Sequence, residues 1–261
     1  MYADDTVLFT AGKNVVDIQK NLQTDFDSIS AWLAKNQLII NTKKGKTEIM
    51  LFGTHQRLWR QQDILSINHN GIPINLTDSY KYLGITLTQA LNMTSHLTET
   101  IKKASSRIRL LQKTRTFMDV DTAILVYQTM ILPLFTYCSF CLYGSTPQYL
   151  KDRFTQLERR AERIIGKSVP KRESILKKRI CSYVHRCMNK QNTCGTFDDY
   201  FEYKSVQHKI RNNGSTLKIP RIKLEAARAT FKYQGVKLFN SLPTDVRKEK
   251  DFNDFKRILP D

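Results

Sequence analysis

The chain has 261 residues, 41% of them hydrophobic, and a formal net charge of +18 at pH 7. This composition predicts a folded protein with a sizeable core and excludes disordered, collagen-like and repeat architectures. Residues 1–53 hold six Lys against six acids, so the whole positive surplus belongs to residues 54–261 and favours a polyanionic partner over a membrane surface.

The cysteine pattern and the start of the chain predict a reduced, intracellular protein. The five cysteines are odd in number, and no apolar signal segment opens the sequence. Residues 122–150 carry no charge and are long enough to span a bilayer. Polar residues within the segment and Pro133 favour a buried helix interrupted at that proline, and no membrane partner is expected.

Two adjacent carboxylates stand near the first residue, in Tyr2-Ala3-Asp4-Asp5. The β-branched and apolar run Thr6–Thr10 that follows them predicts a hairpin turn leading into a buried strand. Hard carboxylate oxygens suit Mg²⁺, and paired Mg²⁺ ions can clamp a phosphoryl transfer. The plain alternative is an ordinary solvated acidic pair.

The next elements alternate between helix and strand. Apolar residues at helical spacing from Val15 to Leu33 predict one long helix that ends near Asn36 and lies against a sheet. Residues 38–41 and 46–53 are predicted strands on either side of a polar turn, and residues 55–62 an exposed connection. Asn70-Gly71 predicts a hairpin with Pro73 at its edge, and residues 80–87 one strand with Gly84 at a bulge or close approach.

From about Asn92 the pattern becomes helical. One predicted helix has an apolar stripe from Leu97 to Leu111 and a basic side, a second runs through Leu125 and Ile131, and a third carries an apolar stripe from Leu150 to Ile164 with its arginines outward. Two such basic faces favour a nucleic-acid groove, although a basic helix face can also be merely solvated. The cations on the first of these helices are Lys102, Lys103, Arg107, Arg109 and Lys113.

The segment after Pro170 is more basic and predicts a loop-rich appendage. A helix is expected after Lys177-Lys178-Arg179 and through Val184, and a turn at Asn212–Ser215. Residues 226–238 are predicted to be helical, with Asn240-Ser241-Leu242-Pro243 ending the helix.

The order of these blocks resembles the reverse transcriptases of non-LTR (LINE-type, jockey-like) retrotransposons from the YADD box of the palm onward. Tyr2–Asp5 corresponds to that box and Tyr82-Leu83-Gly84 to the primer-grip block. The remaining matching blocks are Ala31-Trp32-Leu33 with Asn36, Leu38 and Asn41, Lys46-Thr47-Glu48, Pro133-Leu134 to Tyr137, Tyr143-Gly144, Ile219-Pro220-Arg221 and Asn240 to Pro243.

The resemblance implies an α+β fold in three parts. Residues 1–94 would form an incomplete palm, a small antiparallel sheet with one long helix. Residues 95–167 would form a helical, thumb-like region, and residues 168–261 a basic C-terminal extension. The implied activity is RNA-directed DNA synthesis on an RNA template from a DNA primer, with dNTPs as substrates and Mg²⁺ as cofactor.

The same resemblance implies roles for individual residues. Asp4 and Asp5 would be metal ligands, with Asp4 the more direct one, and Lys46 would stand near the departing pyrophosphate, with Lys43 and Lys44 as competing candidates. Tyr82-Leu83-Gly84 would support the primer end, or serve only as strand core. The family uses a further palm aspartate and fingers that this sequence does not show, so we expect a truncated element copy or an incomplete gene model that is inactive as it stands.

Three other readings stay open. Residues 95–261 could be a non-catalytic RNA- or DNA-binding module, or an inert helical scaffold with solvated charges. Cys181, His185, Cys187 and Cys194, with Cys138-x-x-Cys141 upstream, contain enough ligands for zinc, but their spacing matches no complete zinc motif, and buried thiols with a surface histidine are the default. Phosphate loops, nucleophile elbows, metalloprotease motifs and endonuclease candidates are absent from the sequence.

Overall fold

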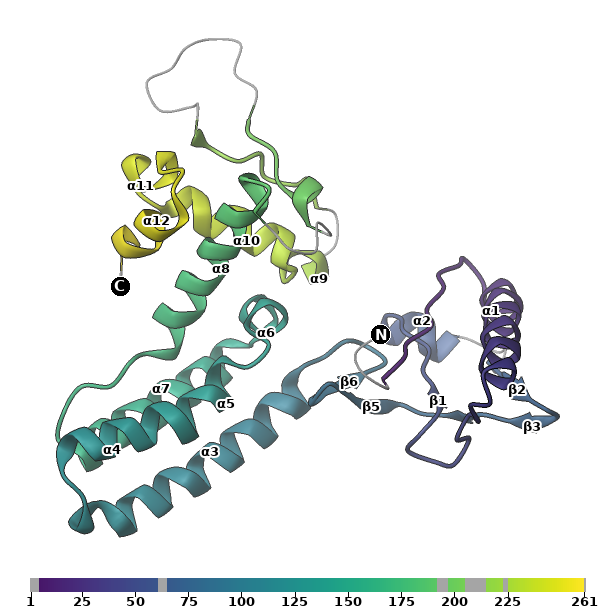
Figure 1. Ribbon diagram of the computed structural model, residues 1–261, viewed down its shortest axis with the longest axis horizontal. Helices are drawn as coiled ribbons and strands as arrows, with labels where there is room; N and C mark the ends of the chain where they lie inside the picture. Colours follow the sequence, from purple (N-terminus) through teal and green to yellow (C-terminus); the bar gives the residue numbers. More distant parts are fainter. Residues whose placement is uncertain (1–4, 61–64, 192–196, 205–214, 223–224, 261) are drawn as a thin grey trace. The chain divides into compact units, whose positions relative to one another are not determined.

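A computed structural model describes residues 5–60, 65–191, 197–204, 215–222 and 225–260 of the chain (Figure 1). The chain divides into two compact units, Met1–His96 and Leu97–Asp261. Short strands occur only in the first unit among these residues, apart from one isolated bridge between Tyr203 and Leu217, and the second unit is mainly helical. The predicted α+β class is therefore confirmed.

The first unit is organised on the helix α1, Val15–Lys35, as its apolar spacing predicts. The Asn14 side chain caps its start by accepting a hydrogen bond from the Asp17 amide at 2.8 Å. Asn36 ends the helix, and the following Gln37 has a φ of 59°. Phe26 anchors the apolar face in a small core with Ile49, Leu65, Ile67 and Ile74.

Three two-stranded sheets replace the single antiparallel sheet that the sequence predicts. Strand β1 (Glu48–Ile49) pairs in parallel with β4 (Asn75–Leu76), whereas β2 (Asn68–His69) with β3 (Ile72–Pro73) and β5 (Ser79–Tyr82) with β6 (Ile85–Thr88) are antiparallel hairpins. Parallel pairing of β1 and β4 is possible because a long crossover connects them. The predicted exposed connection 55–62 lies in this crossover and includes the exposed helix α2, His55–Arg60.

Two turns share one backbone geometry. Asn70 and Gly71 have φ values of 51° and 79°, which confirms the predicted hairpin. Leu83 and Gly84 have φ values of 46° and 81°, so they form a hairpin tip of the same kind. The prediction of one strand over residues 80–87 is wrong, because two consecutive positive φ angles reverse the chain between β5 and β6.

Two predicted strands near the start are also wrong. Residues 6–10 and 38–41 adopt no strand, and Phe9 and Ile39 are 89% and 94% exposed. An apolar run becomes a strand only when a partner strand supplies its ladder hydrogen bonds, and no described strand pairs with either segment. Of the predicted strand 46–53, only β1 forms.

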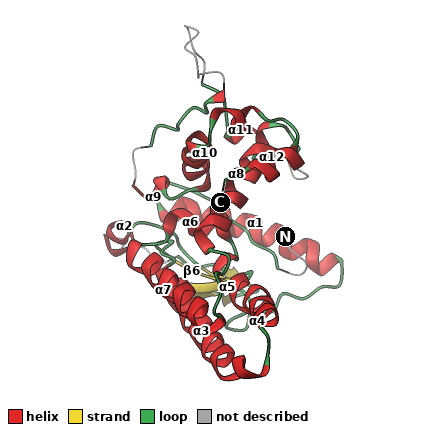
Figure 2. Ribbon diagram, turned by 90° about the vertical axis from the view of Figure 1, so that its left-hand side faces the viewer, coloured by secondary structure: helices red, strands yellow, loops and turns green. Residues whose placement is uncertain are grey.

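In the second unit, α3 (Thr94–Thr114), α4 (Val120–Val126) and α7 (Gln148–Ile165) lie side by side, as Figures 1 and 2 both show. The predicted apolar face of α3 is confirmed, since Leu97, Ala104, Ile108 and Leu111 are buried. The buried face of α7 is rotated slightly from the predicted one. Glu158 and Ile165 are buried, whereas the predicted Leu157 and Ile164 are only partly buried.

The predicted interruption near Pro133 takes the form of a widened turn. After α4 the chain makes a π-helical turn, Tyr127–Ile131, and continues as α5, Leu132–Thr136. Proline lacks an N–H and its ring crowds the preceding turn, which a wider turn accommodates. A separate helix, α6 (Ser139–Ser145), follows. In the parts of the chain that the structure describes, no helix combines the length and apolar character needed to cross a membrane.

The predicted loop-rich appendage contains five α-helices among its described residues, together with irregular segments such as residues 201–204 and 216–222. Helix α8 spans Arg172–Met188, so Lys177–Arg179 lie inside it and do not precede it. The predicted helix 226–238 is split into α9 (Glu225–Arg228) and α10 (Phe231–Ser241), followed by α11 (Thr244–Lys248) and α12 (Phe252–Ile258). These elements enclose a second core that includes Val184, Val236, Phe239 and Phe255. Of the predicted turn 212–215, residues 212–214 lie outside the described residues.

Candidate nucleic-acid interface

One cavity in the first unit collects three of the segments that the sequence singles out. Its volume is about 430 Å³, and its lining includes Thr6–Leu8, Lys46 and Tyr82. Most of the remaining wall is apolar, with Leu22, Phe26, Ile29 and Leu33 of α1 on one part of it. The segment that directly follows the carboxylate pair therefore shares a cavity with the candidate lysine and the candidate primer-grip tyrosine.

Asp4 lies outside the described residues, and Asp5 is exposed and is not part of the cavity lining.

The three candidate lysines lie on one exposed turn. The Lys46 amide donates to the Lys43 carbonyl at 3.0 Å, and the Tyr80 hydroxyl donates to the Lys46 carbonyl at 3.4 Å. These contacts hold the backbone of the turn and leave its ammonium groups at the surface. Of Lys43, Lys44 and Lys46, only Lys46 contributes to the cavity lining.

The predicted primer-grip residues divide between two places. Tyr80 and Tyr82 alternate with exposed residues along β5, and both line the cavity. Leu83 and Gly84 form the hairpin tip beyond the strand, and neither belongs to the lining. The structure therefore brings Tyr82 together with Lys46, but places Gly84 at an exposed turn.

The five predicted cations of α3 are all exposed and fall into two groups. Lys102, Arg109 and Lys113 are spaced by seven and four residues, which places them on one stripe opposite the buried face. Lys103 and Arg107 lie on the flank, where Lys103 pairs with Glu99 at 2.6 Å and Arg107 donates to the Met130 carbonyl. Among the described residues, no ion pair involves the three cations of the stripe.

A second basic surface lies on α7, beside α3. Arg160 donates to the Gln112 side chain of α3 at 2.9 Å and so joins the two helices. Arg153, Arg159 and Arg163 are exposed. The two helices thus present neighbouring sets of cations within one unit.

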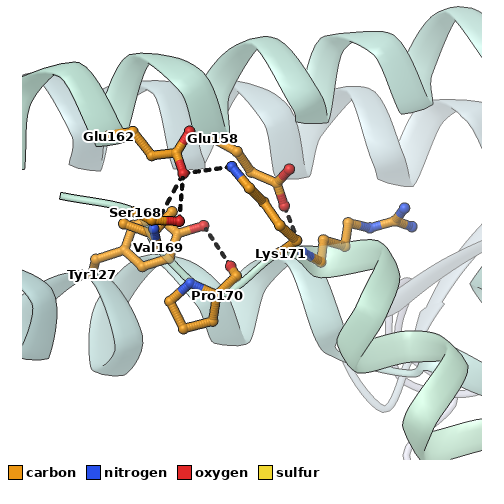
Figure 3. Close-up of polar contacts among 8 residues, drawn as sticks. Tyr127, Glu158, Glu162, Ser168, Val169, Pro170 and Lys171 are labelled. Atoms are coloured by element: carbon orange, nitrogen blue, oxygen red, sulfur yellow. Dashed lines mark hydrogen bonds and ion pairs between the residues drawn. The ribbon is translucent and has the colours of Figure 1, made fainter. Parts of the chain in front are cut away.

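Two acids of α7, Glu158 and Glu162, contact the segment that leads into α8 (Figure 3). The Glu162 carboxylate accepts hydrogen bonds from Ser168 and from the Val169 amide, both at 3.2 Å, and pairs with Lys171 at 2.6 Å. The hydrogen bond from Lys171 lowers the pKa of Glu162. Because Glu162 is paired with its own loop, it does not neutralise the outer arginines.

Glu158 and Arg172 form a buried polar pair that the sequence reading missed. The Arg172 amide donates to Glu158 Oε1 at 2.6 Å, and the Arg172 side chain donates to the Phe135 carbonyl at 3.0 Å and lies over the Phe154 ring. Burial raises the pKa of Glu158 and lowers the pKa of Arg172. The available signal was a glutamate inside the apolar stripe of α7, one residue after Leu157.

The cysteines and histidine that could have held zinc belong mainly to the second core. His185 is buried, its Nε2 donates to the Glu249 carbonyl at 2.9 Å, and its ring stacks on Phe255 at 4.1 Å, so the prediction of a surface histidine is wrong. Cys181 and Cys187 are buried, and burial raises the pKa of Cys181 to about 12. Within the described ranges no three His, Cys, Asp or Glu side chains gather in a way that could hold a metal, and Cys194 lies outside those ranges.

Comparison with known proteins finds two related polymerases. The chain is 26% identical over 135 residues to an RNA-directed DNA polymerase from the mobile element jockey of Drosophila funebris, and 26% identical over 139 residues to its counterpart from Drosophila melanogaster. The matches cover 51% and 52% of this chain and 14% of each polymerase. No family model matches the chain, and no solved structure does.

These matches confirm the resemblance to reverse transcriptases of non-LTR retrotransposons. They support a reverse-transcriptase-like function at the level of the family.

Proposed function

We propose that this chain is a fragment of a jockey-type RNA-directed DNA polymerase. The observation that carries the proposal is the similarity to two jockey RNA-directed DNA polymerases over half of the chain. In this proposal the first unit is part of a palm, and α3 and α7 are part of a thumb that holds a DNA primer on an RNA template. The phosphates of the duplex would lie along the cations of α3 and α7.

Asp4 and Asp5 would hold Mg²⁺ in the proposed palm. The exposed carboxylate of Asp5 is a hard oxygen donor of the kind that Mg²⁺ prefers. When bound, Mg²⁺ stabilises the charge that develops as a dNTP is joined to the primer. Lys46 would place a cation near the departing pyrophosphate, and Tyr82 would support the primer end beside it.

Binding without synthesis is the property that we propose for the chain as it stands. Two-metal transfer needs several converging carboxylates, and the family resemblance implies a third aspartate besides Asp4 and Asp5. Incubation of the purified chain with primed RNA template, Mg²⁺ and dNTPs should therefore give no extension. Template-dependent extension that disappears in Asp4→Asn would contradict this part of the proposal.

Duplex binding by the proposed thumb can be tested separately, because we expect it to depend on the three cations of the α3 stripe. Replacing Lys102, Arg109 and Lys113 together by Gln should weaken binding of a primed RNA template by about tenfold or more at low salt, because three phosphate contacts are lost. A control with Lys237, Lys248 and Lys250 replaced by Gln changes the net charge equally at exposed positions of the same unit. Fluorescence anisotropy measures both, and equal losses would contradict a specific role for α3.

A non-catalytic RNA- or DNA-binding module is the second candidate function. It is favoured by the stripe of α3, whose three cations make no ion pair among the described residues. Binding that is unchanged by Asp4→Asn and Asp5→Asn, and that shows no preference for primed over unprimed template, would favour this candidate over the polymerase.

A further inference from the structure

A further basic surface, separate from those of α3 and α7, lies in a groove between α8, α12 and the connection from α5 to α6. The groove has a volume of about 720 Å³, which is in the size range of small-ligand sites. We call it the α8 groove. Its lining residues are Thr136, Tyr137, Cys138, Phe140, Ile175, Lys178, Arg179, Ser182, Tyr183, Arg186, Phe252, Lys256 and Leu259.

All charged residues that line the α8 groove are basic. Lys178, Arg179 and Arg186 come from α8 and Lys256 from α12, and the lining contains no acid. On α8 the lining positions recur every three or four residues and so form one helix face. That face is distinct from the buried one, which carries Leu176, Ile180 and Val184.

Two arginines of the groove are held in place by neighbouring groups. Arg179 Nη1 donates to the Thr136 carbonyl at 3.0 Å, where α5 ends. The Arg186 guanidinium lies 4.0 Å from the centre of the Phe252 ring, a cation–π contact. A guanidinium carries five N–H donors, so these contacts leave others for a phosphate, and their fixed positions reduce the entropy lost on binding.

Aromatic residues line the α8 groove together with these cations. Phe140 and Tyr183 pack together with their ring centres 4.9 Å apart, and Tyr137 is 51% exposed. Tyr137 stands between the end of α5 and Cys138, whose φ of 49° turns the chain before α6. An exposed aromatic ring beside phosphate-binding cations is a combination by which proteins bind single-stranded nucleic acids, since a base can stack on the ring while the cations neutralise the phosphates.

We propose that the α8 groove binds single-stranded nucleic acid, with Lys178, Arg186 and Lys256 facing phosphates and Tyr137 stacking on a base. This goes beyond the proposed function, because the groove is separate from the α3 stripe and needs neither a primed template nor a metal. An acidic peptide could match the charge of the groove but would place no base on the exposed Tyr137 ring.

The test combines affinity with the location of the bound strand. The double variant Lys178→Gln/Lys256→Gln should bind a single-stranded oligonucleotide about tenfold more weakly at low salt, because two phosphate contacts are lost. The double variant Lys237→Gln/Lys248→Gln, which has the same net charge, should change the affinity by less than about twofold, as expected for a charge outside the contact surface. Tyr137→Leu should weaken binding by about fivefold or more.

Photocrosslinking locates the strand independently of affinity. An oligonucleotide containing 5-iodouridine should crosslink to Tyr137 or Phe252 in the wild type and in the α3 triple variant alike. Retained crosslinks in that variant separate the groove from the proposed thumb, even if the polymerase proposal fails. Crosslinks confined to other helices, equal losses in the two lysine double variants, or displacement by a poly-glutamate peptide as effective as by an oligonucleotide would overturn the assignment.

Discussion

At the scale of single residues, Glu162 shows how one carboxylate fixes a loop. Its lowered pKa means that it stabilises the fold above its ordinary pKa of 4.5, and that this stabilisation is lost as the pH falls through the lower folded-state pKa. Glu162→Gln should therefore lower the free energy of unfolding by about 1 kcal/mol at pH 7, a value reduced by solvent screening. The difference from wild type should disappear at pH values well below 4.5.

Urea unfolding at several pH values measures this effect. Asp152→Asn is the matched control, because Asp152 is on the same helix and accepts only an exposed hydrogen bond from Gln148. Its effect should stay within about 0.5 kcal/mol. A loss in Glu162→Gln that is independent of pH would show that the carboxylate charge does not stabilise the loop.

Cys141 is the residue whose reactivity the structure predicts most directly. It is exposed, and the hydrogen bond from the Cys138 thiol lowers the pKa of Cys141 to about 7. Since the thiolate is the nucleophile, iodoacetamide should alkylate Cys141 at pH 7 well before the buried Cys181 and Cys187. Mass spectrometry of the alkylated peptides across a pH series gives the rates.

The neighbouring thiol provides the control for Cys141. Cys138→Ala removes the donor and should move the alkylation profile of Cys141 toward the ordinary thiol pKa of 9.0, whereas Cys138→Ser keeps a donor and should move it less. An unchanged profile in Cys138→Ala would mean that another group activates Cys141.

At the scale of elements, Gly144 lets α6 pack closely against the chain between α9 and α10. A Cβ added at Gly144 would lie closest to the Ala229 carbonyl, at a distance that real Cβ atoms essentially never show. Gly144→Ala should therefore cost about 1–3 kcal/mol of unfolding free energy through overpacking. Gly53→Ala is the control, because its added Cβ would meet the flexible Leu58 side chain at 3.3 Å and Arg57 Cβ at an ordinary 4.0 Å. A comparable loss there would contradict the packing argument.

Element boundaries show where pattern reasoning works and where it fails. The long helices α1 and α3 follow from apolar spacing, because many turns of the same pattern specify one buried face. Residues 6–10 and 38–41 are as apolar as strands, yet they form none, because pairing depends on distant residues. Leu83-Gly84 became a hairpin tip, since a glycine in a strand pattern is equally compatible with a bulge and with a turn.

At the scale of the whole molecule, the positive surplus lies on helices that also carry buried faces. Helices α3, α7 and α8 each use one side for packing and another for cations. The α3 triple variant should therefore keep the fold while reducing the slope of log affinity against log salt by about 2–3 for a duplex, since each lost phosphate contact removes about 0.9. A salt titration measures this slope, and an unchanged slope would mean that the stripe makes no phosphate contacts.

The sequence by itself determined the α+β class, the long helices and the kinship with jockey polymerases, because helical periodicity and the ordered motif blocks are local properties of the chain. Only the tertiary structure decided that Lys46 and Tyr82 share a cavity, that Glu158 and Arg172 pair inside the helical unit, and that α8 and α12 form a basic groove. Each of these contacts joins residues that are far apart in the sequence and that come together only when the core packs. A local sequence pattern carries no information about such contacts.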